Sequence, residues 1–149
     1  MEVGFIRPID YLEWMANVVL VKMPTSEIRV CTNFKDLNKA CLKDDFPLPN
    51  IDMIIDSLVC YEMLSFMDGF LGYNQIKIKE SDQHKTTFRT PWGNFCYKVM
   101  PFELKNAEAT YQRVMMAMFH EFIHKIVEVY VDDILIKSKA KEDHVKDVK

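Results

Sequence analysis

Apolar residues along the chain follow two different periods, and together they predict a mixture of strands and helices. Residues 16–23 ("ANVVLVKM") and 28–34 ("IRVCTNF") are rich in branched and apolar residues around the turn "PTSE", which predicts a hairpin. A second hairpin is predicted where residues 85–90 and 94–100 flank the turn signal "PWGN". Residues 127–139 ("VEVYVDDILIKSK") predict two further strands that reverse direction near the middle.

Two segments have helical spacing. Residues 51–58 place apolar side chains three and four apart after Asn50, a good N-terminal cap. Residues 106–122 form the longest predicted helix, with Asn106 as its cap and Glu108 in its first turn. Residues 62–68 ("EMLSFMD") are interpreted as a buried strand ending in an acid, residues 74–80 as a half-exposed strand, and the last ten residues as the start of a helix. The mixture predicts an α+β fold.

Asp132 and Asp133 stand side by side within an apolar segment. A buried carboxylate without a partner is among the costliest groups in a fold. One interpretation is an ordinary hairpin turn, since aspartate tolerates turn geometry. The other is a site for a divalent cation, completed by a third acid, for which Asp68 at the end of "LSFMD" is the best candidate.

Two other patterns carry possible chemistry. The segment "HEFIH" places His120, Glu121 and His124 in the order of a zinc metalloprotease helix, and His144 follows 20 residues later (144 − 124). Its location at the end of a predicted helix favours instead a solvated helix end. A set of basic residues is consistent with either a solvated face or a phosphate-binding hairpin: Lys22, Arg29, Lys35, Lys39 and Lys43.

Composition limits these alternatives. The chain has 149 residues, 49% of them hydrophobic and 28% charged, which is ordinary for one globular domain or for two lobes sharing a core. Its net charge of −3 argues against a free-standing nucleic-acid-binding module. Cys31, Cys41, Cys60 and Cys96 are far apart, which predicts reduced thiols in an intracellular protein. We also expect no membrane span and no targeting signal, and hence a cytoplasmic location.

Several blocks, in the same order, resemble the reverse transcriptases of gypsy-type LTR retrotransposons. They are "GFIRPIDYLEWMANVVLVK", "RVCTNFKDLNKACLKDDFPLPNID", "LSFMDGFLGYNQI", "KTTFRTPWGNFCYKVMPFELKNAEATYQRVM" and the "YVDD" box. The resemblance spans essentially the whole chain. It implies the fingers and palm subdomains of a right-hand polymerase, with an antiparallel palm sheet and packed helices. By this resemblance, approximately residues 1–43 and 76–105 are fingers and residues 44–75 and 106–149 are palm.

The resemblance implies a reaction and a site. The reaction is RNA-directed DNA synthesis, the addition of deoxynucleotides to a primer 3′-end with two Mg²⁺ ions, or Mn²⁺ in their place. Asp68 and Asp132 would be the principal metal ligands, Asp133 would complete the catalytic triad, and the main-chain carbonyl of Gly69 would add a ligand.

The same resemblance assigns roles to eleven further positions. Arg29 and Lys22 would grip the triphosphate, Tyr73 would stack under the sugar, and Phe102 would line the nucleotide pocket. Positions near primer and template are Val131, Phe34, Lys35, Leu37, Asn38, Glu103 and Gln112. The implied partners are an RNA or DNA template with its primer and deoxynucleoside triphosphates.

The chain departs from the family pattern at three positions. Glu103 replaces a usual glycine, Glu108 a proline or glycine, and Leu71 a small residue. The thumb, RNase H and integrase regions of such a polyprotein are absent from the sequence, and by the resemblance the natural setting is a virus-like particle. These features leave open a catalytically silent remnant that keeps the fold, and they predict that the isolated fragment is inactive.

Overall fold

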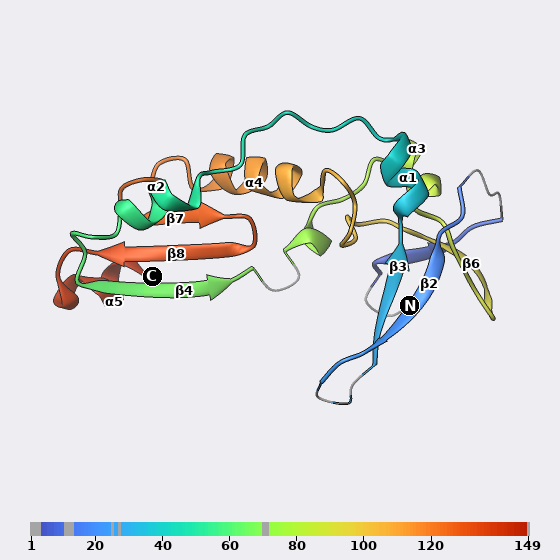
Figure 1. The fold of residues 1–149 in the computed structure, drawn as a ribbon, viewed down its shortest axis with the longest axis horizontal. Coiled ribbons are helices and arrows are strands. Elements are labelled where there is room, and N and C mark those ends of the chain that lie inside the picture. The colour runs from blue at the N-terminus through green and yellow to red at the C-terminus, as the bar shows by residue number, and fades with distance from the viewer. Residues whose placement is uncertain (1–3, 11–13, 25, 27, 70–71, 149) are drawn as a thin grey trace. The chain divides into compact units, whose positions relative to one another are not determined.

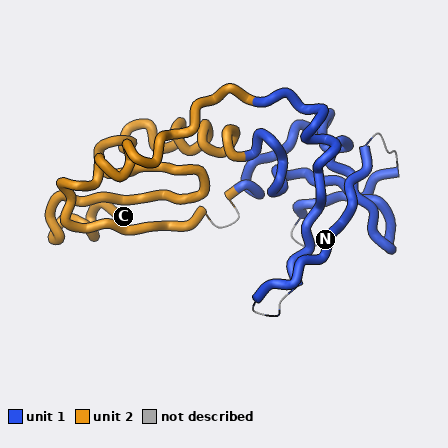
Figure 2. Tube along the Cα trace, in the orientation of Figure 1, with its two compact units in different colours: residues 1–43, 73–107 blue, residues 44–72, 108–149 orange. Residues whose placement is uncertain are grey.

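The computed structural model describes residues 4–10, 14–24, 26, 28–69 and 72–148, and the chain folds into two compact units. Unit 1 comprises residues 1–43 and 73–107, and unit 2 comprises residues 44–72 and 108–149 (Figure 2). Both units combine helices with antiparallel strands, so the predicted α+β class is confirmed (Figure 1). The assignment of particular residue ranges to fingers and palm stays a prediction.

Unit 1 contains a three-stranded sheet and a separate hairpin. The sheet has the order β1 (Ile6–Pro8), β6 (Gly93–Tyr97), β5 (Phe88–Thr90), and all its pairings are antiparallel. The hairpin pairs β2 (Asn17–Lys22) with β3 (Ile28–Asn33), as predicted, although turn residues 25 and 27 lie outside the described part. Short helices complete the unit: α1 (Lys35–Ala40), η1 (Tyr73–Gln75), α3 (Glu80–Gln83) and η2 (His84–Thr86).

The core of unit 1 is aromatic. Phe34, Phe88 and Phe95 are buried together with Ala16, and Tyr97 packs against them. Cys96, between Phe95 and Tyr97 on β6, is fully buried outside this cluster, and burial raises the pKa of its thiol. The two halves of unit 1 are therefore joined by one core, although residues 44–72 separate them in the sequence.

Unit 2 is built around a second antiparallel sheet. Its order is β4 (Met63–Asp68), β8 (Asp133–Ser138), β7 (Val127–Tyr130), so β8 is the central strand. Helix α2 (Ile51–Asp56) begins after Asn50, whose side chain accepts a hydrogen bond from the Asp52 amide, as the capping pattern predicted. Helix α4 (Ala107–Met118) runs alongside β7, and η3 (Lys141–Asp143) and α5 (His144–Asp147) follow β8 (Figure 1).

A buried ion pair joins strands β7 and β8 of unit 2. Lys137 Nζ lies 2.7 Å from Glu128 Oε1 and also donates to Ser57 Oγ. The same ammonium group lies over the Tyr61 ring. The other carboxylate oxygen of Glu128 accepts from His124 Nδ1 at 3.0 Å. A buried charge is tolerated only when it is paired and hydrogen-bonded, so these contacts explain how two charged residues occupy adjacent strands of a core.

Three sequence predictions of secondary structure need correction. Strand β4 is not buried, because β8 is its only strand partner within the described ranges; Phe66 is 70% exposed. Residues 74–80 form no strand; a single bridge joins Lys77 to Val99, and the chain turns into α3. The long helix ends at Met118 rather than at residue 122.

No helix within the described ranges is long and apolar enough to cross a lipid bilayer.

Candidate active site

The two segments that carry the predicted catalytic acids meet at one end of the sheet in unit 2. Asp68 is the last residue of β4 and Asp133 is the first residue of β8, and the two are direct partners across the strands. The Gly69 amide donates to the Asp132 carbonyl at 2.8 Å. The strand register therefore brings Asp68, Asp132 and Asp133 together, although the sequence separates Asp68 from Asp132 by 64 positions (132 − 68).

The surroundings of Asp132 are unfavourable for an isolated carboxylate. Its Oδ1 atom is buried and has no hydrogen-bond partner among the described residues. The pKa of the Tyr111 hydroxyl is raised, first by burial and then by the negative charges of Asp132 and Asp68. Hard divalent cations favour carboxylate oxygens, so an unsatisfied oxygen in this negative field fits such an ion.

The side chains as they lie do not yet form a metal shell. No group of three or more His, Cys, Asp or Glu side chains in the described part is arranged to hold a metal ion. The carbonyl of Gly69, predicted as a further ligand, already accepts from the Gly72 amide at 2.6 Å. A side chain at Gly69 would lie 2.6 Å from the Tyr111 hydroxyl and 2.9 Å from the Asp132 carbonyl, so only glycine fits there.

The turn between β7 and β8 is held by Gln112 on α4. Val131 has φ of 51°, a left-handed conformation that is rare for a β-branched residue. Gln112 accepts from the Val131 amide at 2.8 Å and donates to the Val129 carbonyl at 3.1 Å. The Gln112 side chain is only 1% exposed and holds the backbone of the turn that leads to Asp132 and Asp133, while its role near primer or template stays a prediction.

The predicted triphosphate contacts lie on the β2–β3 hairpin of unit 1. Arg29 is paired with Val21, whereas Lys22 is paired with Ile28. Directly paired residues point to the same face of a ribbon, and successive residues alternate. Lys22 and Arg29 therefore point to opposite faces of the ribbon, and their contact with a triphosphate stays a prediction.

The predicted template-side residues separate into buried and exposed ones. Phe34 is 2% exposed and belongs to the core of unit 1, and its place in a template-side block stays a prediction. Lys35 is exposed, and its amide donates to Asn33 Oδ1. Leu37 packs against the core.

The turn that contains Glu103 is held by Asn38, another predicted template residue. Asn38 donates to the Glu103 carbonyl at 2.7 Å and accepts from the Lys105 amide at 2.8 Å. Glu103 has φ of 71°, in the left-handed region where glycine is favoured. The backbone thus gives a physical reason for the glycine that the family pattern usually has at this position.

Tyr73 and Phe102, predicted for the nucleotide pocket, contact each other edge to face, with ring centroids 5.0 Å apart. Tyr73 is 4% exposed, whereas Phe102 is 53% exposed. The structure thus brings these two residues together within unit 1, with Phe102 as the accessible member. The departure at Leu71 lies outside the described residues, and Glu108 lies in the first turn of α4, where its charge suits the helix dipole.

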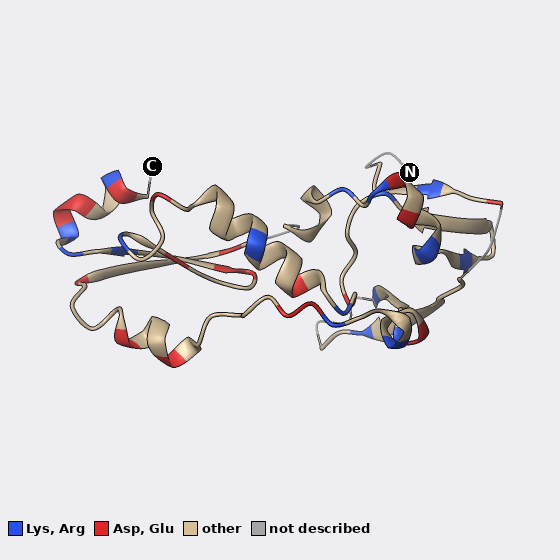
Figure 3. Cartoon of the chain, turned by 90° about the horizontal axis from the view of Figure 1, so that it is seen from above, with Lys and Arg blue, Asp and Glu red and all other residues tan. Residues whose placement is uncertain are grey.

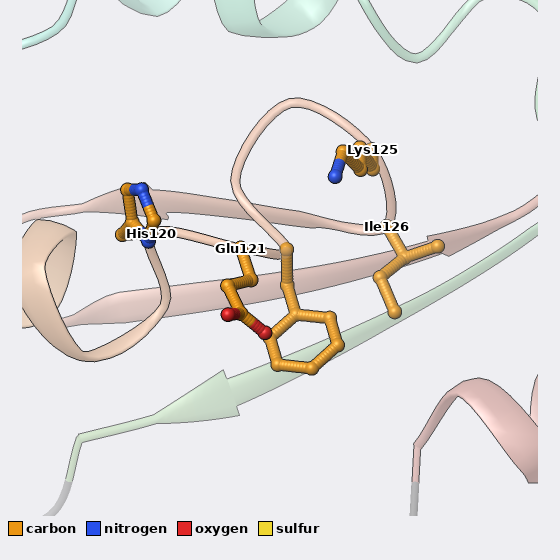
Figure 4. A pocket seen from close by; sticks show the side chains of 5 residues that line it. His120, Glu121, Lys125 and Ile126 are labelled. Atoms are coloured by element: carbon orange, nitrogen blue, oxygen red, sulfur yellow. The ribbon is translucent and has the colours of Figure 1, made fainter.

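The zinc metalloprotease alternative is wrong. The segment from His120 to His124 lies beyond the end of α4, in turns, so its histidines do not share a helical face. His124 has φ of 65° and is bound to Glu128. His120 and Glu121 line an open hollow of about 530 Å³ with Phe122, Lys125 and Ile126 (Figure 4). His144 is engaged elsewhere, by two serines.

Charges of both signs occur in both units rather than forming one basic face (Figure 3). Sequence reasoning missed the roles of two residues, Tyr111 beside the acids and His144 at the other end of β8. Tyr111 approaches Gly69, and only its location in the "ATYQR" block could have drawn attention to it. His144 was considered only as a zinc ligand, and no sequence signal connects it to Ser65 and Ser138.

Comparisons with known proteins match most of the chain to one family. The sequence profile of the family described as "Reverse transcriptase (RNA-dependent DNA polymerase)" matches residues 21–149. The chain belongs to the reverse transcriptase family. An RNA-directed DNA polymerase homolog from Oenothera berteroana is 34% identical over 122 residues, a match that covers 80% of this chain and 86% of that protein.

Other relatives of this reverse transcriptase chain are much longer. The retrovirus-related Pol polyprotein from transposon gypsy of Drosophila melanogaster is 36% identical over 120 residues, covering 80% of this chain and 12% of the polyprotein. The polyprotein from transposon opus of the same organism is also 36% identical, over 98% of this chain and 15% of its own length. The gypsy-type family assignment made from the sequence is thereby confirmed.

Solved reverse transcriptases share the fold. The prototype foamy virus protease-reverse transcriptase matches with a TM-score of 0.86 at 20% identity, over 97% of this chain and 19% of that protein. A foamy viral protease-reverse transcriptase in complex with double-stranded DNA also has a TM-score of 0.86, at 18% identity, over 99% of this chain and 25% of its own length. The predicted fold of a right-hand polymerase is confirmed by these likenesses.

Proposed function

We propose that the chain carries the reaction centre of an RNA-directed DNA polymerase that extends a primer 3′-end with deoxynucleotides by a two-metal mechanism. The observation that carries the proposal is the pairing of Asp68 with Asp133, beside the buried and unpartnered Oδ1 of Asp132. Two divalent ions, when bound, would activate the primer hydroxyl and stabilise the leaving pyrophosphate. Mg²⁺ is the expected ion, since it binds carboxylates together with substrate phosphates, and Mn²⁺ is a plausible substitute.

The other residues of the chain would bind and orient the reactants. Asp68 and Asp132 supply negative oxygens, and Gln112 fixes the turn on which Asp132 and Asp133 stand. Arg29, exposed on the hairpin of unit 1, is suited to a triphosphate because its guanidinium forks onto two oxygens. Phe102, supported by Tyr73, offers an accessible ring for the nucleotide.

The partners follow from the relatives. A related foamy viral enzyme is described in complex with double-stranded DNA, which supports a template–primer duplex as the partner of this chain as well. The chain spans 12% to 15% of the gypsy and opus polyproteins, so we propose that it works together with thumb, RNase H and integrase regions of a longer product. Its cytoplasmic location is part of the same proposal.

A second function, that of a silent remnant which keeps the fold, is favoured by one observation. Glu103 carries a side chain and a negative charge at a backbone conformation that favours glycine. In that case the fold would persist while the nucleotide path is disturbed.

Primer extension separates the two functions. Residues 1–149 alone should show none, because a reacting group misplaced by about 1 Å can cost on the order of a hundredfold in rate. Grafted into a full-length related polymerase, the segment should support extension that depends on Mg²⁺ and is abolished by Asp132→Asn. Asp143→Asn, in η3, is the matched control and should change little. A graft that folds but stays inactive even with Glu103→Gly would refute the polymerase proposal and support the remnant.

A further inference from the structure

Strand β4 carries Asp68, yet its own hydrophobic pattern does little to specify its pairing with β8. Apolar residues occupy both of its faces: Met63 and Met67 on one, Leu64 and Phe66 on the other. If the pairing of β4 with β8 slipped by one residue, apolar side chains of β4 would take the places of other apolar side chains on each face. The register of such a strand is only weakly specified. The same slip would move Asp68 by about 3.3 Å along β8, away from Asp133.

One side chain bridges β4 and β8 on the face of Ser65. His144, the first residue of α5, is buried, and its Nε2 lies 2.7 Å from Ser65 Oγ in β4. Its Nδ1 lies 2.8 Å from Oγ of Ser138, the last residue of β8. Since Ser65 is paired with Ile136, the imidazole reaches diagonally across two positions of the ladder.

The direction of the hydrogen bond between His144 and Ser138 follows from the contact of Ser138 with Asp147. Ser138 donates its single hydroxyl proton to Asp147 Oδ2 at 2.6 Å, because an ionised carboxylate can only accept. Ser138 Oγ must then accept from His144 Nδ1–H. The second ring nitrogen, Nε2, shares a hydrogen bond with the Ser65 hydroxyl, which can serve as donor or acceptor. All three bonds are satisfied together only when both strands lie in the observed register.

We propose that His144 is a positioning residue for the polymerase reaction, acting as a pin that fixes the register of β4 against β8 and so holds Asp68 opposite Asp133. The link to catalysis rests on the proposed function, whereas the pin itself does not. Buried polar groups that bond only in one arrangement exclude alternatives that apolar burial would allow. The exposed, two-faced strand β4 is where such a constraint is needed.

Hydrogen exchange of the full 149-residue chain tests the pin without reference to activity. Ser65→Ala removes one contact, and it should speed exchange in residues 63–68 by about fivefold, the ratio that corresponds to one hydrogen bond. Residues 127–130 in β7 should be unaffected. Ser65→Thr keeps the hydroxyl and should restore slow exchange, and Val145→Ala, an exposed position on α5, should have no effect. Equal acceleration in β4 and β7, or no rescue by threonine, would overturn the pin.

Kinetics of the grafted polymerase test the link to catalysis. Ser65→Ala and His144→Gln should lower the burst rate constant at each active site, with the nucleotide KM unchanged and with Ser65→Thr near the parent value. A smaller burst amplitude at an unchanged rate constant would mean only that fewer molecules are folded, and it would overturn the positioning role. If the parent graft is inactive, the proposed function fails, while hydrogen exchange still decides whether the pin exists.

Discussion

The turn at Val131 in unit 2 and the turn at Glu103 in unit 1 are held by the same arrangement of two hydrogen bonds. Each contains a non-glycine residue with positive φ, and each is held by a carboxamide side chain from a helix that donates to a carbonyl and accepts from an amide. The two arrangements differ in how far their hydrogen bonds are exposed to solvent. Gln112 is almost completely buried, whereas the bonds of Asn38 are exposed to solvent. Water can replace the partners of Asn38 but not those of Gln112, so the buried clamp should stabilise its turn far more.

The largest effect is expected at the buried clamp. Gln112→Ala should lower the free energy of unfolding by about 3 kcal/mol, because it leaves the half-buried Val131 amide and the buried Val129 carbonyl without their partner and opens a cavity. Urea unfolding followed by circular dichroism measures this loss. Met118→Ala, at an exposed position of the same helix, should stay within about 0.5 kcal/mol of the parent. Similar losses in both variants would show that Gln112 matters only for helix packing.

The exposed clamp should be weaker. Asn38→Ala is expected to cost about 1 kcal/mol or less, since solvent can satisfy the Glu103 carbonyl and the Lys105 amide. The same urea titration measures it, and Lys39→Ala on the same helix serves as the control. A loss equal to that of Gln112→Ala would contradict the view that exposure separates the two turns.

Removing the side chain at the strained position of unit 1 should stabilise the protein. Glu103→Gly is expected to raise the free energy of unfolding by about 0.5 kcal/mol, because the relief of left-handed strain exceeds the added entropy of the unfolded chain. Glu103→Ala keeps the strain and removes only the charge, so it isolates the backbone contribution. If alanine stabilises as much as glycine, charge rather than φ is the cause.

The smallest effect concerns Arg113, the neighbour of Gln112 on α4. Its guanidinium binds Asp44 through both carboxylate oxygens, and this hydrogen bonding holds the pKa of Asp44 below its ordinary value of 3.8. A depressed folded-state pKa contributes stability that is present above pH 3.8 and is lost as the pH falls through the folded value. The difference in Tm between the parent and Asp44→Asn should therefore be small at neutral pH and vanish in strong acid. A difference that grows on acidification would contradict this sign.

The sequence predicted much of this molecule where local pattern and packing agree. The β2–β3 and β5–β6 hairpins, the cap at Asn50 and the strands around Asp132 and Asp133 follow from turn residues and alternation. The burial of β4 was wrong because an apolar run does not reveal that a strand has only one neighbour. The pairing of Lys22 with Ile28 could not be predicted, since a hairpin's register depends on the geometry of its turn.

Of the candidate site, the acids were found by resemblance, but the groups that hold them were not. Gln112 was assigned to primer and template because its block resembles the family, while the structure places its amide on the Val131 turn. His144 joins Ser65 across 79 positions (144 − 65), and nothing local in the sequence indicates such a contact. Side chains that act through another residue are found only when the fold brings them together.

The burial of Cys96 makes the rate at which its thiol is alkylated a measure of how often unit 1 opens. Thiolates rather than thiols react with alkylating reagents, and burial both shields this sulfur and raises its pKa. Cys60, in unit 2, is exposed and should be labelled at once. Labelling of Cys96 must wait until unit 1 opens, so its rate, read by mass spectrometry, reports how often the structure around strand β6 opens under native conditions.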